Sequence, residues 1–157
     1  MMIRMAAKDD IEHLIQFRFD YFATENWQIT GEARMQMESR LRQYYSQHLN
    51  RDFFAALAEA DGGEIVSTAF LVIVEKPANL SFPTGKTGLL LNVLTKAKHR
   101  GKGYATGTIT ALIERAKRLE VSYIELSASE MGKPLYEKLG FQEKTSSHFK
   151  PMQLSLL

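Results

Sequence analysis

The chain contains no cysteine among its 157 residues, and this absence excludes several classes of protein. A disulfide framework, a zinc site with thiolate ligands and a catalytic cysteine all need this residue. The absence also fits a reducing compartment. No apolar run approaches the roughly 18 residues that a membrane-spanning helix needs, and residues 1–4 lack the apolar core of a secretory signal. We therefore expect a soluble, cytoplasmic protein.

A strong excess of one charge is missing as well. Lysine and arginine total 20 and aspartate and glutamate total 18, so the net charge is only +2. Proteins that bind nucleic acid usually carry clustered basic residues. The hydrophobic content of 45% is that of an ordinary globular protein, and the length suits one domain. We expect a single domain over residues 1–157 that binds neither nucleic acid nor a membrane.

The spacing of apolar and turn residues predicts strands and helices along the whole chain. A first helix is expected from Ile11 to about Phe22, capped by Asp9 or Asp10 and broken by residues 24–31. Further helices are expected over residues 32–49, 103–119 and 134–139, the first of these with Met35, Leu41, Tyr45 and Leu49 facing inward. Strands are expected over residues 2–5, 53–59, 65–74, 89–94, 122–127, 141–147 and 153–157. This order predicts a mixed α/β domain, in which helices cover the faces of a mixed sheet.

The most informative segment is Lys98–Thr106, which lies between a predicted strand and a predicted helix. Glycines let backbone N–H groups approach a phosphate, and the N-terminus of the helix adds partial positive charge. Lys98, Arg100 and Lys102 add full charges. The segment fits neither a P-loop nor a G-x-G-x-x-G fingerprint. It predicts an anion-binding loop, or else a tight turn with a solvated basic rim.

Two motifs in this half of the chain resemble those of one family. Residues 100–105, Arg-Gly-Lys-Gly-Tyr-Ala, have the form R-x-x-G-x-A, which is similar to the pyrophosphate-binding signature of the GNAT superfamily of N-acetyltransferases. Residues 91–95 look like the central strand of that family. Residues 128–141, which end in Tyr-Glu-Lys-Leu-Gly-Phe, resemble its closing motif. The specific resemblance covers about residues 89–143.

The resemblance implies a mainly antiparallel mixed sheet that is splayed between two central strands, with helices on both faces. It implies acetyl-CoA as the acetyl donor, bound in the opening between those strands. Main-chain groups of Val93, Leu94 and Thr95 would contact the pantetheine arm. The residues expected to hold the pyrophosphate are Arg100, Gly101, Lys102, Gly103, Tyr104, Ala105 and Thr106.

The resemblance also implies a catalytic role for Tyr136. When an amine attacks a thioester, the leaving group is a thiolate, which a nearby phenol can protonate as a general acid. The alternative is a tyrosine that packs its ring against the core. Many family members carry an asparagine where this chain has Ser129, whose hydroxyl offers the cofactor a single donor.

The acceptor and the general base have no specific motif. Glu25, Glu125 and His13 are candidate bases by residue type alone. The family walls its acceptor site with the region between the first two helices, which suggests Tyr21, Glu25 and Trp27 as substrate-binding residues. Phe82 in the middle loop and Asn92 beside the cofactor strand are further candidates. Core packing is the alternative for the aromatic residues, and a structural hydrogen bond is the alternative for Asn92.

Three functions follow from these observations. The first is an N-acetyltransferase that acts on a primary amine of a small molecule. The second is a module that binds acyl-CoA without catalysis, and the third is an acetyltransferase for a protein amine. An acceptor on tRNA is disfavoured by the small net charge. Residues 153–157 suggest either a strand that pairs across a homodimer interface or an apolar tail that packs on its own sheet.

Overall fold

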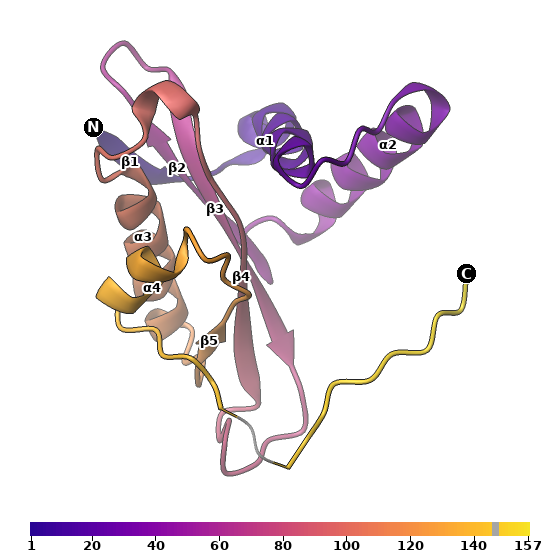
Figure 1. Ribbon diagram of the computed structural model, residues 1–157, viewed down its shortest axis with the longest axis vertical. Helices are drawn as coiled ribbons and strands as arrows, with labels where there is room; N and C mark the ends of the chain where they lie inside the picture. The colour runs from indigo at the N-terminus through magenta and orange to yellow at the C-terminus, as the bar shows by residue number, and fades with distance from the viewer. Residues whose placement is uncertain (146–147) are drawn as a thin grey trace. The chain divides into compact units, whose positions relative to one another are not determined.

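Five strands form one sheet in the order β1-β2-β3-β4-β5 in this computed structural model (Figure 1). The strands are β1 Met2–Met5, β2 Phe53–Glu59, β3 Ile65–Glu75, β4 Lys86–Thr95 and β5 Ile124–Glu125. Neighbouring strands from β1 to β4 are antiparallel, and β5 runs parallel to β4. The mixed α/β sheet expected from the sequence is therefore confirmed.

The structure describes residues 1–145 and 148–157, which group into two compact units, Met1–Ser127 and Ala128–Leu157. The first unit holds the sheet, the helices α1 Ile11–Thr24, α2 Gly31–His48 and α3 Tyr104–Arg118, and the 3-10 turns η1 Lys8–Asp10 and η2 Ala97–His99. The second unit holds α4, Lys133–Lys138.

Helices cover both faces of the sheet in the first unit (Figure 1). Side chains along β2 alternate between the faces. Phe53, Ala55 and Leu57 belong to the hydrophobic cluster formed with α1. On the other face, the ring of Phe54 lies 5.4 Å from the guanidinium carbon of Arg115 in α3. Sequence alternation in one buried strand thus anchors helices on two sides.

Strands β4 and β5 separate soon after they meet. Register pairs between β4 and β5 are confined to Gly88 with Ile124 and Leu89 with Glu125. A Cβ atom added at Gly88 would lie 2.9 Å from a Leu71 methyl group, so glycine allows the close packing at this junction. Beyond Leu89, β4 still pairs with β3 on one side. Its other edge, which faces β5, has no strand partner there among the described residues. This is the splayed sheet that the sequence predicts.

The two final strands expected from the sequence are wrong for the described residues. Residues 141–145 and 153–157 have no regular secondary structure, and residues 146 and 147 lie outside the described part of the chain. Side chains in the last segment, including Leu154 and Leu156, are exposed. An apolar pattern alone does not make a strand, because a strand also needs a partner to take its backbone hydrogen bonds.

Three local expectations also need correction. Met35 faces outward and is 71% exposed, because α2 buries only a narrow stripe around Tyr45. The carboxylate of Asp10 precedes α1 without capping it, because its oxygens accept from Arg4 and from the backbone N–H of Ala7. The strand expected over residues 122–127 is reduced to β5, because its pairing with β4 ends where the sheet splays.

Candidate active site

The loop between β4 and α3 is built around two glycines with left-handed backbone conformations. Gly101 has φ 74° and Gly103 has φ 83°, values that side chains with a Cβ rarely adopt. A Cβ added at either position would meet nothing within 4 Å, so the space beside both is open. Gly103 is also the N-terminal cap of α3. The loop therefore presents bare backbone to an open space at the start of a long helix.

Six consecutive backbone N–H groups in this loop have no protein acceptor. None of the amides from Gly101 to Thr106 donates a hydrogen bond within the described residues, and the first amide to do so is that of Gly107, 3.0 Å from the carbonyl of Gly103. The first amides of any helix lack internal partners. Here the glycine conformations extend the free run by three residues before the helix. Such a row of donors, together with the helix dipole, favours a bound anion.

Positive side chains surround the free amides. The Nε of Arg100 donates to the carbonyl of Thr95 at 3.2 Å, which ties the loop back to the end of β4. Lys98 and Lys102 are exposed. Lys96, just before the loop, pairs with Glu64 at 2.9 Å, and this contact lowers the pKa of the Glu64 carboxyl. Charge at the loop is therefore net positive, as an anion-binding site requires.

Beyond Leu89, β4 contains a β-bulge in its pairing with β3. Thr68 of β3 pairs with Leu94 and Phe70 pairs with Leu91, so Asn92 and Val93 together face the single residue between them on β3. Asn92 has φ 53°, which bends the strand at this point. Beyond the bulge, the hydroxyl of Ser67 donates to the carbonyl of Leu94 at 3.1 Å. The predicted pantetheine-binding residues are half-buried at this bent, open edge.

Asn92 is a structural link between the bulge and α1. Its side chain is 1% exposed. Its Nδ2 donates to the carbonyl of Phe17 at 3.2 Å, and its Oδ1 accepts from the Nη1 of Arg18 at 3.2 Å. Both sides of the amide are therefore occupied by protein groups. The hydrogen-bonding alternative for Asn92 fits the structure better than direct contact with a substrate.

Aromatic residues expected at the acceptor site divide into two places. Trp27 is 62% exposed and stacks on Phe22 with 5.8 Å between ring centroids. Tyr21 is half-buried against the core, and Glu25 is exposed at the end of α1. These residues lie on the same segment as Arg18, which contacts the bulge.

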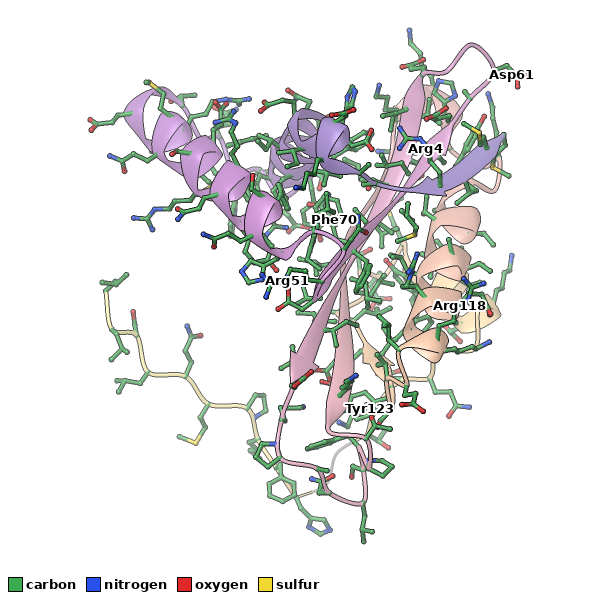
Figure 2. The ribbon with its side chains drawn as sticks, turned by 180° about the vertical axis from the view of Figure 1, so that it is seen from behind. Arg4, Arg51, Asp61, Phe70, Arg118 and Tyr123 are labelled. Atoms are coloured by element: carbon green, nitrogen blue, oxygen red, sulfur yellow. The ribbon has the colours of Figure 1, made fainter. Side chains whose placement is uncertain are left out.

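Phe82 lies elsewhere. It packs on Tyr123 with 6.3 Å between ring centroids, and Lys76 Nζ lies 4.4 Å from its ring. Figure 2 shows Tyr123 toward one end of the sheet, whereas Phe70, the register neighbour of the bulge, lies in the middle. The structure does not bring Phe82 together with Trp27 and Asn92.

Tyr136 and Ser129 belong to the second unit. The Ser129 hydroxyl accepts from the backbone N–H of Gly132 at 3.1 Å, which shapes the turn into α4. The Tyr136 ring lies edge-on to Phe141 with 5.9 Å between centroids. Gly140, the residue after the C-cap of α4, has φ 94°, a left-handed conformation that glycine adopts readily at the end of a helix. The catalytic role of Tyr136 and the cofactor contact of Ser129 stay predictions.

Sequence reasoning did not single out Arg18 as a functional residue. The sequence does contain a sign of its special position, because this arginine lies between Phe17 and Phe19 in an apolar helical pattern. Both phenylalanines are buried. Among the candidate bases, Glu25, Glu125 and His13 are all exposed, and none is distinguished from the others. Across residues 1–145 and 148–157, no three His, Asp or Glu side chains gather as ligands for a metal ion. No helix in the same residues is long and apolar enough to cross a membrane.

Solved structures of similar fold span almost the whole chain. A predicted acetyltransferase from Clostridium acetobutylicum, solved with acetyl-CoA, is 27% identical with a TM-score of 0.81 and covers 97% of this chain and 95% of its own. A GCN5-related N-acetyltransferase from Ralstonia eutropha JMP134 is 24% identical with a TM-score of 0.76, covering 96% and 97%. Glucosamine-6-phosphate N-acetyltransferase from Arabidopsis thaliana is 22% identical with a TM-score of 0.68, covering 97% and 98%.

No curated protein matches this chain in sequence. The sequence model described as "Acetyltransferase (GNAT) family" matches residues 12–141, which include the R-x-x-G-x-A loop, the bulged strand and the closing motif. That match covers most of the first unit and residues 128–141 of the second. The chain therefore belongs to the GNAT family of acetyltransferases.

Proposed function

We propose that this protein is an acetyl-CoA-dependent N-acetyltransferase that transfers an acetyl group to a primary amine of a small molecule. The observation that carries the proposal is the run of six unpaired amides from Gly101 to Thr106 at the N-terminus of α3. A pyrophosphate group supplies enough acceptor oxygens to use these donors. The similar protein from Clostridium acetobutylicum, solved with acetyl-CoA, supports this choice of ligand.

The residues of the loop and of β4 fit acetyl-CoA as a donor. The open space beside Gly101 and Gly103 admits phosphate oxygens close to the backbone. The unpartnered edge of β4 from the bulge onward offers main-chain groups to an amide-containing arm such as pantetheine. Bound acetyl-CoA supplies a thioester, which an amine can attack directly. Donors aimed at the developing oxyanion would lower the barrier to that attack.

The proposed reaction needs one base and one acid. A C–N bond forms between the amine nitrogen and the acetyl carbon, and the C–S bond to CoA breaks. The nitrogen gives up a proton to a base, and the CoA thiolate takes a proton from the Tyr136 hydroxyl. The acetylated amine and free CoA are the products.

A small-molecule acceptor is supported by one of the similar structures. Glucosamine-6-phosphate N-acetyltransferase, as its name says, acts on an amino sugar. The acceptor would bind at the segment between α1 and α2, where Trp27 is exposed close to the helix that contacts the bulge. This segment is accessible to a ligand of small size.

Thermal unfolding with and without acetyl-CoA tests the proposal. A ligand at a hundred times its dissociation constant stabilises the folded state by about 2.7 kcal/mol, which raises the midpoint by about 5–10 °C for a chain of this size. Gly103→Glu places a carboxylate in the loop and should abolish the rise. Gly31→Glu is the matched control, because Gly31 also has a positive φ with nothing within 4 Å and opens α2 on the other face of the sheet.

Two results would reject the proposal at different steps. If saturating acetyl-CoA does not raise the midpoint of the folded wild type, the loop is only a turn. If acetyl-CoA binds but no amine in a broad panel releases CoA thiol, the protein binds the cofactor without catalysis.

A further inference from the structure

Arg18 is a half-buried cation without a carboxylate partner. No aspartate, glutamate or C-terminal oxygen within residues 1–145 and 148–157 lies within 4.0 Å of its guanidinium. A guanidinium carries five N–H donors, and one of them reaches a protein acceptor, the Asn92 Oδ1 at 3.2 Å. The remaining donors have no hydrogen-bond partner in the described residues. Partial burial of a charge costs free energy, which an anionic partner would offset.

The neighbouring arginine on α2 shows the contrast. Arg34 also lies over an aromatic ring, with its guanidinium carbon 4.2 Å from the centroid of Phe19. Its Nε donates to the Glu38 carboxylate at 2.9 Å, so its charge is balanced within the protein. Arg18 has the same kind of ring contact, 4.6 Å from Phe22, without that balance.

Two contacts hold Arg18 in a defined orientation. Its guanidinium lies over the Phe22 ring, and its Nη1 is anchored to the buried Asn92 amide. A cation over an aromatic face is stabilised by the ring quadrupole. Arg18 also acts electrostatically on Tyr45, where burial raises the pKa of the phenol and the positive charge of Arg18 opposes that rise. A side chain held in this way loses little freedom when it binds an anion.

Arg18 lies beside the place where acetyl transfer would occur. Asn92, its partner, forms the β4 bulge with Val93, and residues 93–95 are those expected to hold the cofactor arm. On its other side, the Phe22 ring stacks on exposed Trp27. Arg18 thus joins the free edge of β4 to the exposed segment that follows α1.

We propose that Arg18 binds an anionic group, a carboxylate or a phosphate, carried by the acceptor amine. This inference rests on the proposed function and assigns the substrate class, an amine with an acidic group. The planar fork of arginine matches both anions with paired hydrogen bonds. Exposed Trp27 would contact the apolar body of the same molecule. Arg18 then selects the substrate and takes no part in proton transfer.

Matched pairs of amines test the proposal. One set compares amino acids with their amides, and a second compares amino-sugar phosphates with the unphosphorylated amino sugars. Binding is measured by calorimetry to protein saturated with CoA, and turnover is measured with acetyl-CoA. We expect at least one acidic member to bind about tenfold or more tightly than its neutral partner, since hydrogen bonds to charged groups are the stronger class. The set that shows this preference identifies carboxylate or phosphate.

The variants then assign the preference to one residue. Arg18→Gln should remove the preference by weakening the acidic member about tenfold or more, with the neutral member and acetyl-CoA unchanged. Arg18→Lys should restore part of it, because the charge returns without the fork. Arg34→Gln is the matched control and should keep the full preference, because Glu38 already balances that arginine.

The salt dependence of KM in the wild type tests the proposal even if the variants do not fold. Raising the salt concentration should raise the KM of the acidic member and leave that of the neutral member unchanged. The inference is overturned if acidic and neutral members bind equally, or if Arg18→Gln weakens both alike, since Arg18 would then only support Phe22 and Asn92. Failure of acetyl-CoA to bind the wild type would instead overturn the proposed function itself.

Discussion

The ion pair that Asp10 forms at the start of α1 allows a quantitative test of the fold. Asp10 is 6% exposed. Its Oδ2 and Oδ1 accept from the two terminal nitrogens of Arg4 at 2.8 Å each, and Oδ2 also accepts the backbone N–H of Ala7 at 2.8 Å. Arg4 in turn contacts Glu59 of β2. One carboxylate therefore joins the edge strand, η1 and the entry to α1; Figure 2 labels Arg4 in this position.

Asp10→Asn keeps the shape of the side chain and removes its charge. Losing one partner of a fully buried pair costs about 3–5 kcal/mol. The Arg4 side chain is one-third exposed and keeps Glu59, so solvent screening reduces the loss, and we expect about 2 kcal/mol. For a chain of this length the unfolding midpoint falls by about 4–8 °C. Urea unfolding at neutral pH measures the free-energy difference directly.

The pH dependence has a defined sign. Hydrogen bonding from Arg4 is the main cause that lowers the pKa of Asp10 below its ordinary 3.8. A carboxylate with a lowered folded pKa contributes its full stability above the unfolded pKa, and that stability is lost as the pH falls through the folded pKa. The difference in free energy of unfolding between wild type and Asp10→Asn should therefore be constant near neutral pH. It should shrink under acid conditions below about pH 4.

The control is an exposed pair that also joins an arginine to a carboxylate. Arg42 Nε contacts Glu12 at 2.8 Å with both side chains largely exposed, and this contact lowers the pKa of Glu12. Glu12→Gln should leave the midpoint unchanged within error. A negligible effect of Asp10→Asn at neutral pH, or a gap that does not narrow on acidification, would refute the reasoning.

Three further predictions concern the core, a helix contact and catalysis. Leu14→Ala empties a fully buried position in α1 and should cost about 2–5 kcal/mol in urea unfolding; a loss below 1 kcal/mol, on the order of a surface change, would contradict the packing. At Gly107, an added Cβ would lie 2.9 Å from the Ile3 Cδ1, so Gly107→Val should destabilise by about 1–3 kcal/mol, and Ile3→Ala in the same chain should recover part of that loss. Tyr136→Phe should lower kcat about a hundredfold with little change in acetyl-CoA affinity, whereas full turnover from about pH 6 to about pH 9 would remove the general-acid role.

Local chain chemistry explains why much of the fold follows from the sequence. The strand expected over residues 53–59 is β2 with the same bounds, because a continuous run of apolar residues is bounded by turn signals. Gly62 and Gly63 adopt the positive φ values of a tight hairpin turn. Helix α3 begins within one residue of its expected start, where the glycines of the loop end. Each of these features depends on residues that are neighbours along the chain.

Predictions of features that depend on partners distant in the sequence were wrong, or were not made at all. The final strands over residues 141–147 and 153–157 were expected from apolar patterns, but the described parts of both segments have no strand partner. Met35 continues the apolar spacing of α2, yet nothing covers that side of the helix enough to bury it. Burial is decided by what packs against a surface, and periodicity gives only the direction in which a side chain points.

The candidate site also contains some features that depend on neighbours in the sequence and others that depend on distant contacts. The sequence by itself determined the loop of free amides, because Gly101 and Gly103 and the start of α3 expose them through local backbone geometry alone. Only the tertiary structure decided the surroundings of Arg18. The contact between Arg18 and Asn92 joins residues 74 positions apart, and the bulge that carries Asn92 exists only because β3 and β4 pair out of register. A charge that no carboxylate balances can be recognised only when its neighbours in space are known.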